Sequence, residues 1–208
     1  MIYKDLKGKT AIVTGSGKKT GIGYGIAEKL ASCGCNVIIA DLGKVPSPAE
    51  PLKTATSEEM DTIAAELAKT YSVKTLSVGV DVTDNNAIGL MVEKIKGAFD
   101  HIDILCNNAG ASFGVPNTVL SYDEAAWIKT VDVNLFSVFR LSRAVIPLML
   151  GKPASIVVLN NDASSPKRHF SRSVAICPGQ MALTRIPLPP NSLAIVLVSM
   201  ITPALATA

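Results

Sequence analysis

Histidine, cysteine and aromatic residues are scarce in this chain of 208 residues. Its two histidines, His101 and His169, are too few for a histidine-rich metal centre, and its four cysteines show no paired C-x-x-C spacing. We therefore expect neither a metal site nor a disulfide framework. No signal peptide precedes Lys4, and together these features favour a reduced, cytoplasmic protein.

Acidic residues are missing from the C-terminal part of the chain. All 17 of them lie at or before Asp162, against 16 of the 20 lysines and arginines, so residues 1–162 carry a net charge of −1 and residues 163–208 one of +4. No basic stripe with interleaved aromatic residues accompanies this charge, so a nucleic-acid partner is not expected. The apolar stretch 193–206 is too short for a membrane span, so no membrane partner is expected either.

Glycine, by contrast, is concentrated near the N-terminus. The apolar run Thr10–Thr14 breaks into a glycine-rich turn, after which Ile22, Ile26 and Leu30 repeat at helical spacing. This order predicts a strand, a phosphate-binding loop and a helix over residues 21–32, with backbone N–H groups turned towards a pyrophosphate. The expected cofactor-binding residues of this loop are Thr14, Gly15, Ser16, Gly17, Gly21, Ile22 and Gly23.

A second apolar strand, residues 36–40, ends in Asp41, about 20 residues beyond the loop. A carboxylate at this point can accept hydrogen bonds from a ribose 2′-hydroxyl and repels a 2′-phosphate, so we expect NAD to be preferred over NADP. Lys18 and Lys19 in the loop argue the other way. The alternative is that Asp41 is only a turn residue at the end of a strand.

Strands and helices alternate along the rest of the chain. Strands are expected at residues 75–80, 102–106 and 155–159, and helices at residues 56–71, 84–99 and 122–150. Two capping boxes, Thr56 to Glu59 and Ser121 to Glu124, predict helix starts. The alternation predicts an α/β fold, a doubly wound parallel sheet of Rossmann type in a single domain. The proline-rich segment 42–55 is either a solvated loop or a flap over bound cofactor.

With these motifs in place, residues 8 to about 160 resemble a short-chain dehydrogenase/reductase. The resemblance rests on four motifs in the right order, which are Thr14-Gly15…Gly21-Ile22-Gly23, Asp81-Val82, Asn107-Asn108-Ala109-Gly110 and Val133-Asn134-Leu135. One departure concerns the glycine loop, in which five residues separate Thr-Gly from Gly-Ile-Gly where the family has three.

The resemblance implies roles for the later motifs. Asp81 would accept a hydrogen bond from the adenine amino group, and Val82 would pack against the ring. Asn107 would brace the central sheet, Asn108 would belong to the cofactor-binding residues, and Ala109 and Gly110 would lie against the adenine ribose. Asn134 would be the catalytic residue that orders a proton-relay water; the alternative is a helix amide bonded to its own backbone.

The family's catalytic Tyr, Lys and Ser have no recognisable counterparts. No tyrosine follows Tyr122, and if the next helix is matched to the family, Ser173 takes the Tyr position and Cys177 the Lys position. Neither residue can replace a tyrosine whose pKa is lowered by a lysine. Half of the 12 prolines fall after residue 162. We therefore expect a cofactor domain at 1–161 and an atypical, proline-rich tail at 162–208 that is not the family's own and in which Leu193 to Met200 can form one further strand.

The function expected from the resemblance is an NAD(P)-dependent oxidoreductase acting on a hydroxyl or carbonyl of a small molecule. Two alternatives stay open, a catalytically inactive dinucleotide-binding or oligomer-forming protein and a truncated product. A homo-oligomer is expected through helices 84–99 and 122–150, because Phe136, Phe139 and Val145 leave the long helix apolar on more than one side.

Overall fold

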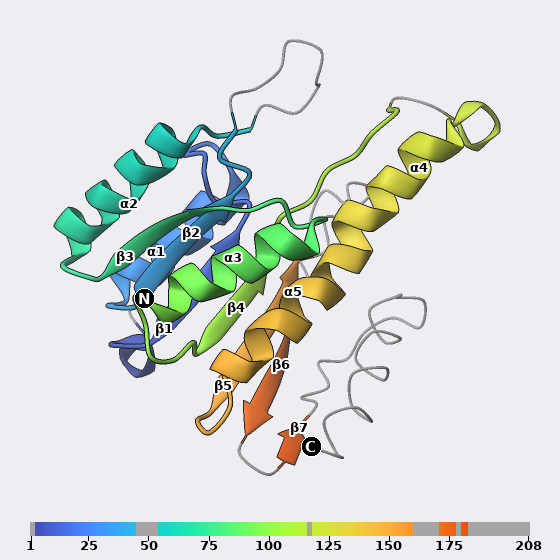
Figure 1. The fold of residues 1–208 in the computed structure, drawn as a ribbon. Helices are drawn as coiled ribbons and strands as arrows, with labels where there is room; N and C mark the ends of the chain where they lie inside the picture. The colour runs from blue at the N-terminus through green and yellow to red at the C-terminus, as the bar shows by residue number, and fades with distance from the viewer. Residues whose placement is uncertain (1–2, 45–53, 116–117, 160–170, 178–179, 183–208) are drawn as a thin grey trace.

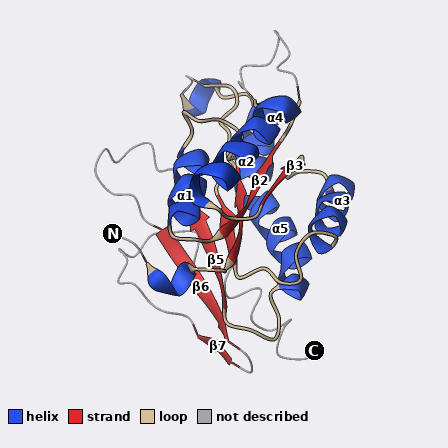
Figure 2. Ribbon diagram, turned by 90° about the vertical axis from the view of Figure 1, so that its left-hand side faces the viewer, coloured by secondary structure: helices blue, strands red, loops and turns tan. Residues whose placement is uncertain are grey.

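The computed structural model describes residues 3–44, 54–115, 118–159, 171–177 and 180–182, which form one sheet with helices on both faces (Figures 1 and 2). The strands are β1 (Thr10–Thr14), β2 (Asn36–Asp41), β3 (Thr75–Gly79), β4 (Ile104–Asn107), β5 (Ala154–Leu159), β6 (Ser171–Cys177) and β7 (Gln180–Ala182). The α-helices are α1 (Ile22–Ser32), α2 (Ser57–Tyr71), α3 (Asn85–Lys96), α4 (Glu124–Val131) and α5 (Ser137–Val145). Shorter helical turns are η1 (Lys4–Leu6), η2 (Val119–Ser121), η3 (Asp132–Phe136) and η4 (Ile146–Leu148).

The expected doubly wound parallel sheet is confirmed. The strand order is β3-β2-β1-β4-β5-β6-β7, and β1 to β5 are parallel, with Ile12 opposite Ile38 on one side and Leu105 on the other. The order reverses between β1 and β4. In open sheets of this kind a ligand binds beyond the carboxyl ends of the strands at that reversal.

The sheet continues past residue 161 with two antiparallel strands. β6 pairs with β5 in the opposite direction, Ser173 lying opposite Val157, and β7 pairs with β6. Residues 171–177 are therefore a strand, whereas the match to the family required a helix there. The further strand expected at residues 193–200 lies outside the described residues, and the boundary at residue 161 stays a prediction.

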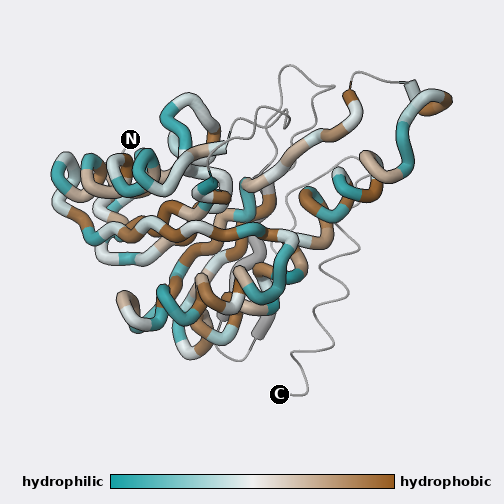
Figure 3. Tube along the Cα trace, turned by 45° about the horizontal axis from the view of Figure 1, so that its top comes forward, coloured by the Kyte–Doolittle hydropathy of each residue, from teal (hydrophilic) through white to brown (hydrophobic). Residues whose placement is uncertain are grey.

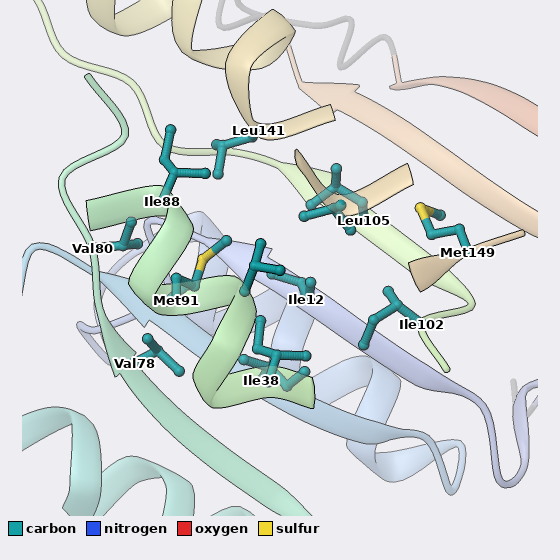
Figure 4. Packing of buried hydrophobic residues seen from close by; sticks show 14 of the residues in the cluster. Ile12, Ile38, Val78, Val80, Ile88, Met91, Ile102, Leu105, Leu141 and Met149 are labelled. Atoms are coloured by element: carbon teal, nitrogen blue, oxygen red, sulfur yellow. The ribbon is translucent and has the colours of Figure 1, made fainter. Parts of the chain in front are cut away.

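Hydrophobic side chains fill both spaces between the sheet and the helices. Because side chains alternate along a strand, Ile12 and Ile38 pack against α3 and α5, while Val13 and Ile39 pack against α1 and α2. Figure 4 shows the first cluster, and Figure 3 shows hydrophobic residues gathered along the central strands. The helices expected at 56–71 and 84–99 each bury one apolar face, which includes Met60 and Ile63 in the first and Ile88 and Met91 in the second. The layers hold the carboxyl ends of β1 to β4 rigidly together.

The two predicted capping boxes have different outcomes. At α2 the box is present, since Thr56 Oγ1 accepts from Glu59 N at 3.2 Å and Glu59 Oε2 accepts from Thr56 N at 2.9 Å. The box at Ser121 is wrong, because α4 starts after Asp123, whose carboxylate accepts from the first N–H groups of the helix. Aspartate caps as well as serine and lies directly at the turn. Ser121 instead closes the η2 turn by accepting from Thr118 N at 3.2 Å.

The long helix expected over 122–150 is not regular. It begins as α4, changes to a π-helical turn at η3, continues as α5 and ends in the short η4. The π turn contains Asn134, the expected catalytic residue, so the irregularity lies at the candidate site.

Across the described part of the chain, every helix is too short or too polar to cross a bilayer.

Candidate functional site

Four loops meet at the carboxyl ends of β1 to β4, next to the reversal of strand order. They carry Gly15 to Gly21 after β1, Leu42 to Lys44 after β2, Val80 to Asp84 after β3 and Asn108 to Gly114 after β4. Three of the four motifs noted in the sequence therefore come to one edge of the sheet, and the fourth, Val133-Asn134-Leu135, lies on η3 and contacts the loop after β4 through Asn134. The hydrogen bonds below show which of their residues touch.

The Thr14 hydroxyl joins the glycine loop to the loop after β4. It donates to Cys106 O at 3.3 Å and accepts from the N–H groups of Asn108 and Ala109 at 3.0 and 2.9 Å. The Asn108 side chain returns the contact by donating to Thr14 O at 2.8 Å and Gly15 O at 3.2 Å. Thr14 is almost fully buried. Its side chain therefore shapes the loop from beneath, and direct contact with a cofactor stays a prediction that its burial does not favour.

Two glycines of the loop are required by close backbone contact. Gly15 has φ of +67°, which disfavours any side chain, and a Cβ there would lie 2.9 Å from the Cα of Ala109. A Cβ on Gly23 would lie 2.2 Å from the carbonyl oxygen of Gly15. The loop thus folds back onto the first turn of α1, as a loop that surrounds a phosphate group must.

Ser16 and Gly17 connect the loop to the end of β2. Ser16 is fully buried, and its hydroxyl donates to Val13 O at 2.7 Å and accepts from Ala40 N at 3.3 Å. The Gly17 N–H donates to Asp41 Oδ2 at 2.8 Å, and a Cβ on Gly17 would lie 2.6 Å from that of Ala55. Ser16 is a brace, and Gly17 brings the loop against the predicted ribose carboxylate.

Helix α1 begins without a side-chain cap. Its N-cap is Gly21, whereas α2, α3 and α4 are capped by Thr56, Asp84 and Asp123. The first turn of α1 holds no acidic residue, and Ile22 there is half exposed. The N–H groups of a helix start need acceptors, and an uncapped start beside a glycine loop suits an anionic ligand such as a pyrophosphate.

Asp81 lies at the end of β3 with its carboxylate held by neighbours. Thr83 donates to Asp81 Oδ1 from its N at 3.0 Å and from its Oγ1 at 2.6 Å, and Lys44 Nζ lies 4.0 Å from Oδ2. Partial burial raises the pKa of Asp81, but the Thr83 hydrogen bonds, with Lys44 and Lys129, outweigh it and lower the pKa below 3.8. Asp81 is an ionised acceptor, as the predicted adenine contact needs. Val82 is 8% exposed within the core, which leaves little side-chain surface for a ring.

Asn107 and Asn108, adjacent in sequence, face different surroundings. The Asn107 side chain is buried and donates to Ser142 Oγ of α5 at 3.4 Å, so it links the central sheet to a helix. Its Oδ1 is buried without a hydrogen-bond partner among the described residues. This geometry agrees with the bracing role expected for Asn107, whereas Asn108 holds the glycine loop.

Asn134 faces the loop after β4 from the π turn. Its Nδ2 donates to Thr130 O at 2.7 Å and also to Ala111 O. A Cβ on Gly110 would lie 2.6 Å from Asn134 Oδ1, so Gly110 is required for this approach. The amide bonds to its own helix, as the alternative interpretation expects, and also joins that helix to a second loop, while the catalytic role of Asn134 stays a prediction. Asn134 is exposed, and its Oδ1 has no hydrogen bond within the described chain.

Two lysines near the site form ion pairs, Lys19 of the glycine loop and Lys44 after β2. Lys19 forms an ion pair with Glu66 of α2 at 2.5 Å, so its charge is directed to that helix. Lys44 lies beside Asp81 and was not singled out from the sequence. The only sequence signal for Lys44 is its position three residues after Asp41, and the contact depends on the turn at Gly43, which has φ of +64°.

The segment 42–55 is tied down at its base. Thr54 Oγ1 donates to Lys44 O at 3.1 Å, and Ser57 Oγ donates to Gly43 O at 2.9 Å. Residues 45–53 lie outside the described part, so the choice between loop and flap is not tested.

Comparisons with known proteins agree with this geometry. Residues 9–171 match the family model described as short chain dehydrogenase. The chain is 35% identical over 148 residues to 3-oxoacyl-[acyl-carrier-protein] reductase FabG of Escherichia coli, covering 71% of this chain and 52% of that protein. It is 30% identical over 187 residues to 3beta-hydroxysteroid dehydrogenase 1 of Eggerthella lenta, covering 88% and 65%. The chain thus spans about half the length of the first of these relatives.

Solved structures with the same fold include cofactor complexes. Carveol dehydrogenase from Mycobacterium avium in complex with NAD superposes with a TM-score of 0.66 at 26% identity, over 75% of this chain and 55% of that one. L-sorbose reductase from Gluconobacter frateurii, complexed with NADPH and L-sorbose, gives 0.59 at 28% identity, over 74% and 52%. The fold therefore occurs with either dinucleotide.

Proposed function

Because this chain belongs to the short-chain dehydrogenase/reductase family, we propose that it binds NAD as the cofactor domain of an oxidoreductase for a small hydroxyl or carbonyl compound. The observation that carries the proposal is the uncapped start of α1 beside a glycine loop in which Gly15 and Gly23 have no room for a side chain. A dinucleotide pyrophosphate supplies the acceptors that this helix start lacks.

The ribose end of the site supports NAD over NADP. The Asp41 carboxylate lies against Gly17, and it would repel the 2′-phosphate of NADP at this point. Lys19, which argued for NADP, is paired with Glu66 instead. Asp81 and the loop from Asn108 to Gly110 are the residues that we propose to contact the adenosine.

The reaction that we propose is transfer of a hydride to or from the nicotinamide ring of the cofactor when the cofactor is bound. Asn134 Oδ1 accepts no hydrogen bond within the described chain, so it is available to hold a water for proton relay. The family's proton donor has no evident substitute, since Tyr122 donates to Phe113 O and no tyrosine follows it. Tyr24 is a poorer base still, because burial and Glu28 raise its pKa. We propose that the chain as written binds cofactor and turns over far more slowly than its relatives.

The expected rate loss is large. Absence of general acid catalysis costs about 10²- to 10⁴-fold, and absence of oriented hydrogen bonds to a developing oxyanion about 10²- to 10³-fold, although such losses need not add. The second candidate, a catalytically silent dinucleotide-binding protein, is favoured by the same missing tyrosine.

The test separates binding from turnover. Titration calorimetry should show saturable NAD binding, and no binding would contradict the proposal. NADH oxidation is then measured against a panel of ketones and aldehydes, for this chain and for a chimera whose residues after 159 come from an active relative. Turnover by the chimera alone would place the defect in the tail, and ordinary turnover by this chain would refute the slow rate.

The three described cysteines, Cys33, Cys35 and Cys106, are buried and free. Free thiols support a reducing compartment, and we propose the cytoplasm.

A further inference from the structure

The π turn that presents Asn134 is bridged by an ion pair between its first residue and the following helix. Asp132 Oδ1 lies 2.7 Å from Arg140 Nη2. The backbone closes the same turn, because Ser137 N donates to Asp132 O, a spacing of five residues in place of four. The side chain and the backbone carbonyl of Asp132 therefore both hold this one turn.

The ion pair depends on the π geometry. In a regular α-helix, residues eight apart are separated by about 2.2 turns and lie about 80° apart around the axis. A π turn rotates through fewer degrees per residue, which brings residues 132 and 140 towards the same face. Long side chains on a helix lean towards its N-terminus, so Arg140 extends back in the direction of Asp132.

The surroundings of Arg140 hold it in this position. Its guanidinium carbon lies 5.9 Å from the centre of the Phe136 ring, at the last residue of the π turn. The Arg140 and Asp132 side chains are 23% and 29% exposed, and Arg140 Nη1 is buried with no partner among the described residues. A partly buried pair of this kind is worth more than an exposed one.

We infer that Asp132 and Arg140 are positioning residues, which clamp the π turn so that Asn134 donates to Ala111 O and Thr130 O and leaves its Oδ1 towards the cofactor site. Without the ion pair, the π turn Asp132–Phe136 would return to α-helical geometry. Asn134 would then rotate away from the loop after β4. The inference rests on the proposed function only because that function makes Asn134 important. The ion pair and the hydrogen bonds of Asn134 exist without a ligand.

Exchange of the Asn134 side-chain amide protons with solvent tests the clamp without cofactor or activity. The resonances are assigned in ¹⁵N-asparagine-labelled protein by their loss in Asn134→Asp. We expect Asp132→Asn and Arg140→Met each to speed this exchange about tenfold, the size of one charge-assisted hydrogen bond. Arg140→Lys, which keeps the charge, should restore slow exchange.

Arg143→Met is the matched control, because Arg143 stacks on Phe139 of the same helix at 5.6 Å and forms no ion pair within the described chain. It should leave the exchange within about twofold of the wild type. The double variant of Asp132 and Arg140 should be no faster than either single one, since coupled residues are not additive. Backbone amides of β1 report global unfolding and should stay protected.

Additive effects, an equal effect of Arg143→Met, or unchanged exchange in both single variants would overturn the clamp. Acceleration in β1 by the same factor as at Asn134 would overturn it too, since the effect would then be loss of the whole fold. Failure of NAD to bind, with the exchange pattern as expected, would refute the proposed function and leave the clamp standing.

Discussion

The Asp41 carboxylate accepts a hydrogen bond from the Gly17 N–H at 2.8 Å, across 24 residues of chain, and so joins the end of β2 to the glycine loop. Its other oxygen accepts from Leu42 N at 2.8 Å. Asp41 therefore shapes the loop, and its proposed contact with the ribose is a second role that mutation can separate from the first.

Replacement of Asp41 should change cofactor choice. Asp41→Asn keeps an acceptor for Gly17 but loses the charge, so the preference for NAD over NADP should shrink. Asp41→Ala removes the acceptor too and should weaken NAD binding about 10- to 100-fold, from the loss of about 1.5–3 kcal/mol in hydrogen bonds to a charged group. Dissociation constants for NAD and NADP measured by titration calorimetry check this, and a wild-type preference for NADP would refute the assignment.

Two glycines of α1 should respond oppositely to the same change. Gly23→Ala places a Cβ 2.2 Å from Gly15 O, so it should disrupt the loop and abolish NAD binding. Gly25→Ala meets nothing within 4 Å and should raise the free energy of unfolding by about 0.5–1 kcal/mol through helix propensity. Urea denaturation and NAD titration of both variants make the comparison, and equal binding by the two would contradict the described loop.

Acid should remove a stabilising contribution from Asp81. Because the pKa of Asp81 is lowered by folding from 3.8, its ionised form stabilises the fold above that value and the contribution is lost as the pH falls through the lowered one. The stability difference between wild type and Asp81→Asn should therefore be full at pH 6 and shrink below about pH 4. Urea denaturation at both pH values measures it, and a difference that grew in acid would have the wrong sign.

Two thiols should be inert in the folded protein. Burial raises the pKa of Cys35 and of Cys106 to about 12, so almost no thiolate exists at pH 8. Iodoacetamide followed by peptide mass spectrometry should label neither residue in buffer and both in urea. Rapid labelling of Cys106 in the native protein would show that β4 is accessible to solvent.

Self-association through the long helix is expected. Phe136 and Phe139 are 51% and 42% exposed on its surface, where Arg140 and Arg143 stack on them. Sedimentation at high micromolar concentration should show a dimer or larger species, and Phe136→Asp with Phe139→Asp should give a monomer. Tyr3→Asp, at a similarly exposed aromatic residue outside this helix, is the control. A monomeric wild type would count against the interface.

The sequence by itself determined the parallel core and the place of the site. Apolar runs such as Val37 to Ala40 and helical repeats such as Ile88, Met91 and Ile95 express burial in a local pattern, and glycines at 15 and 23 mark backbone contacts that no side chain allows. These features need only neighbouring residues to be recognised, because periodicity and backbone freedom are properties of short segments.

Only the tertiary structure decided how side chains are directed within the site. Lys19 pairs with Glu66 of another helix, Asp41 reaches Gly17, and Asn134 meets Ala111 across 23 residues. The π turn and the antiparallel β6 also depart from the expected helices. The three side-chain contacts join groups distant in sequence, and the free energy of such a contact exists only after the layers have packed and fixed the distance between the two groups.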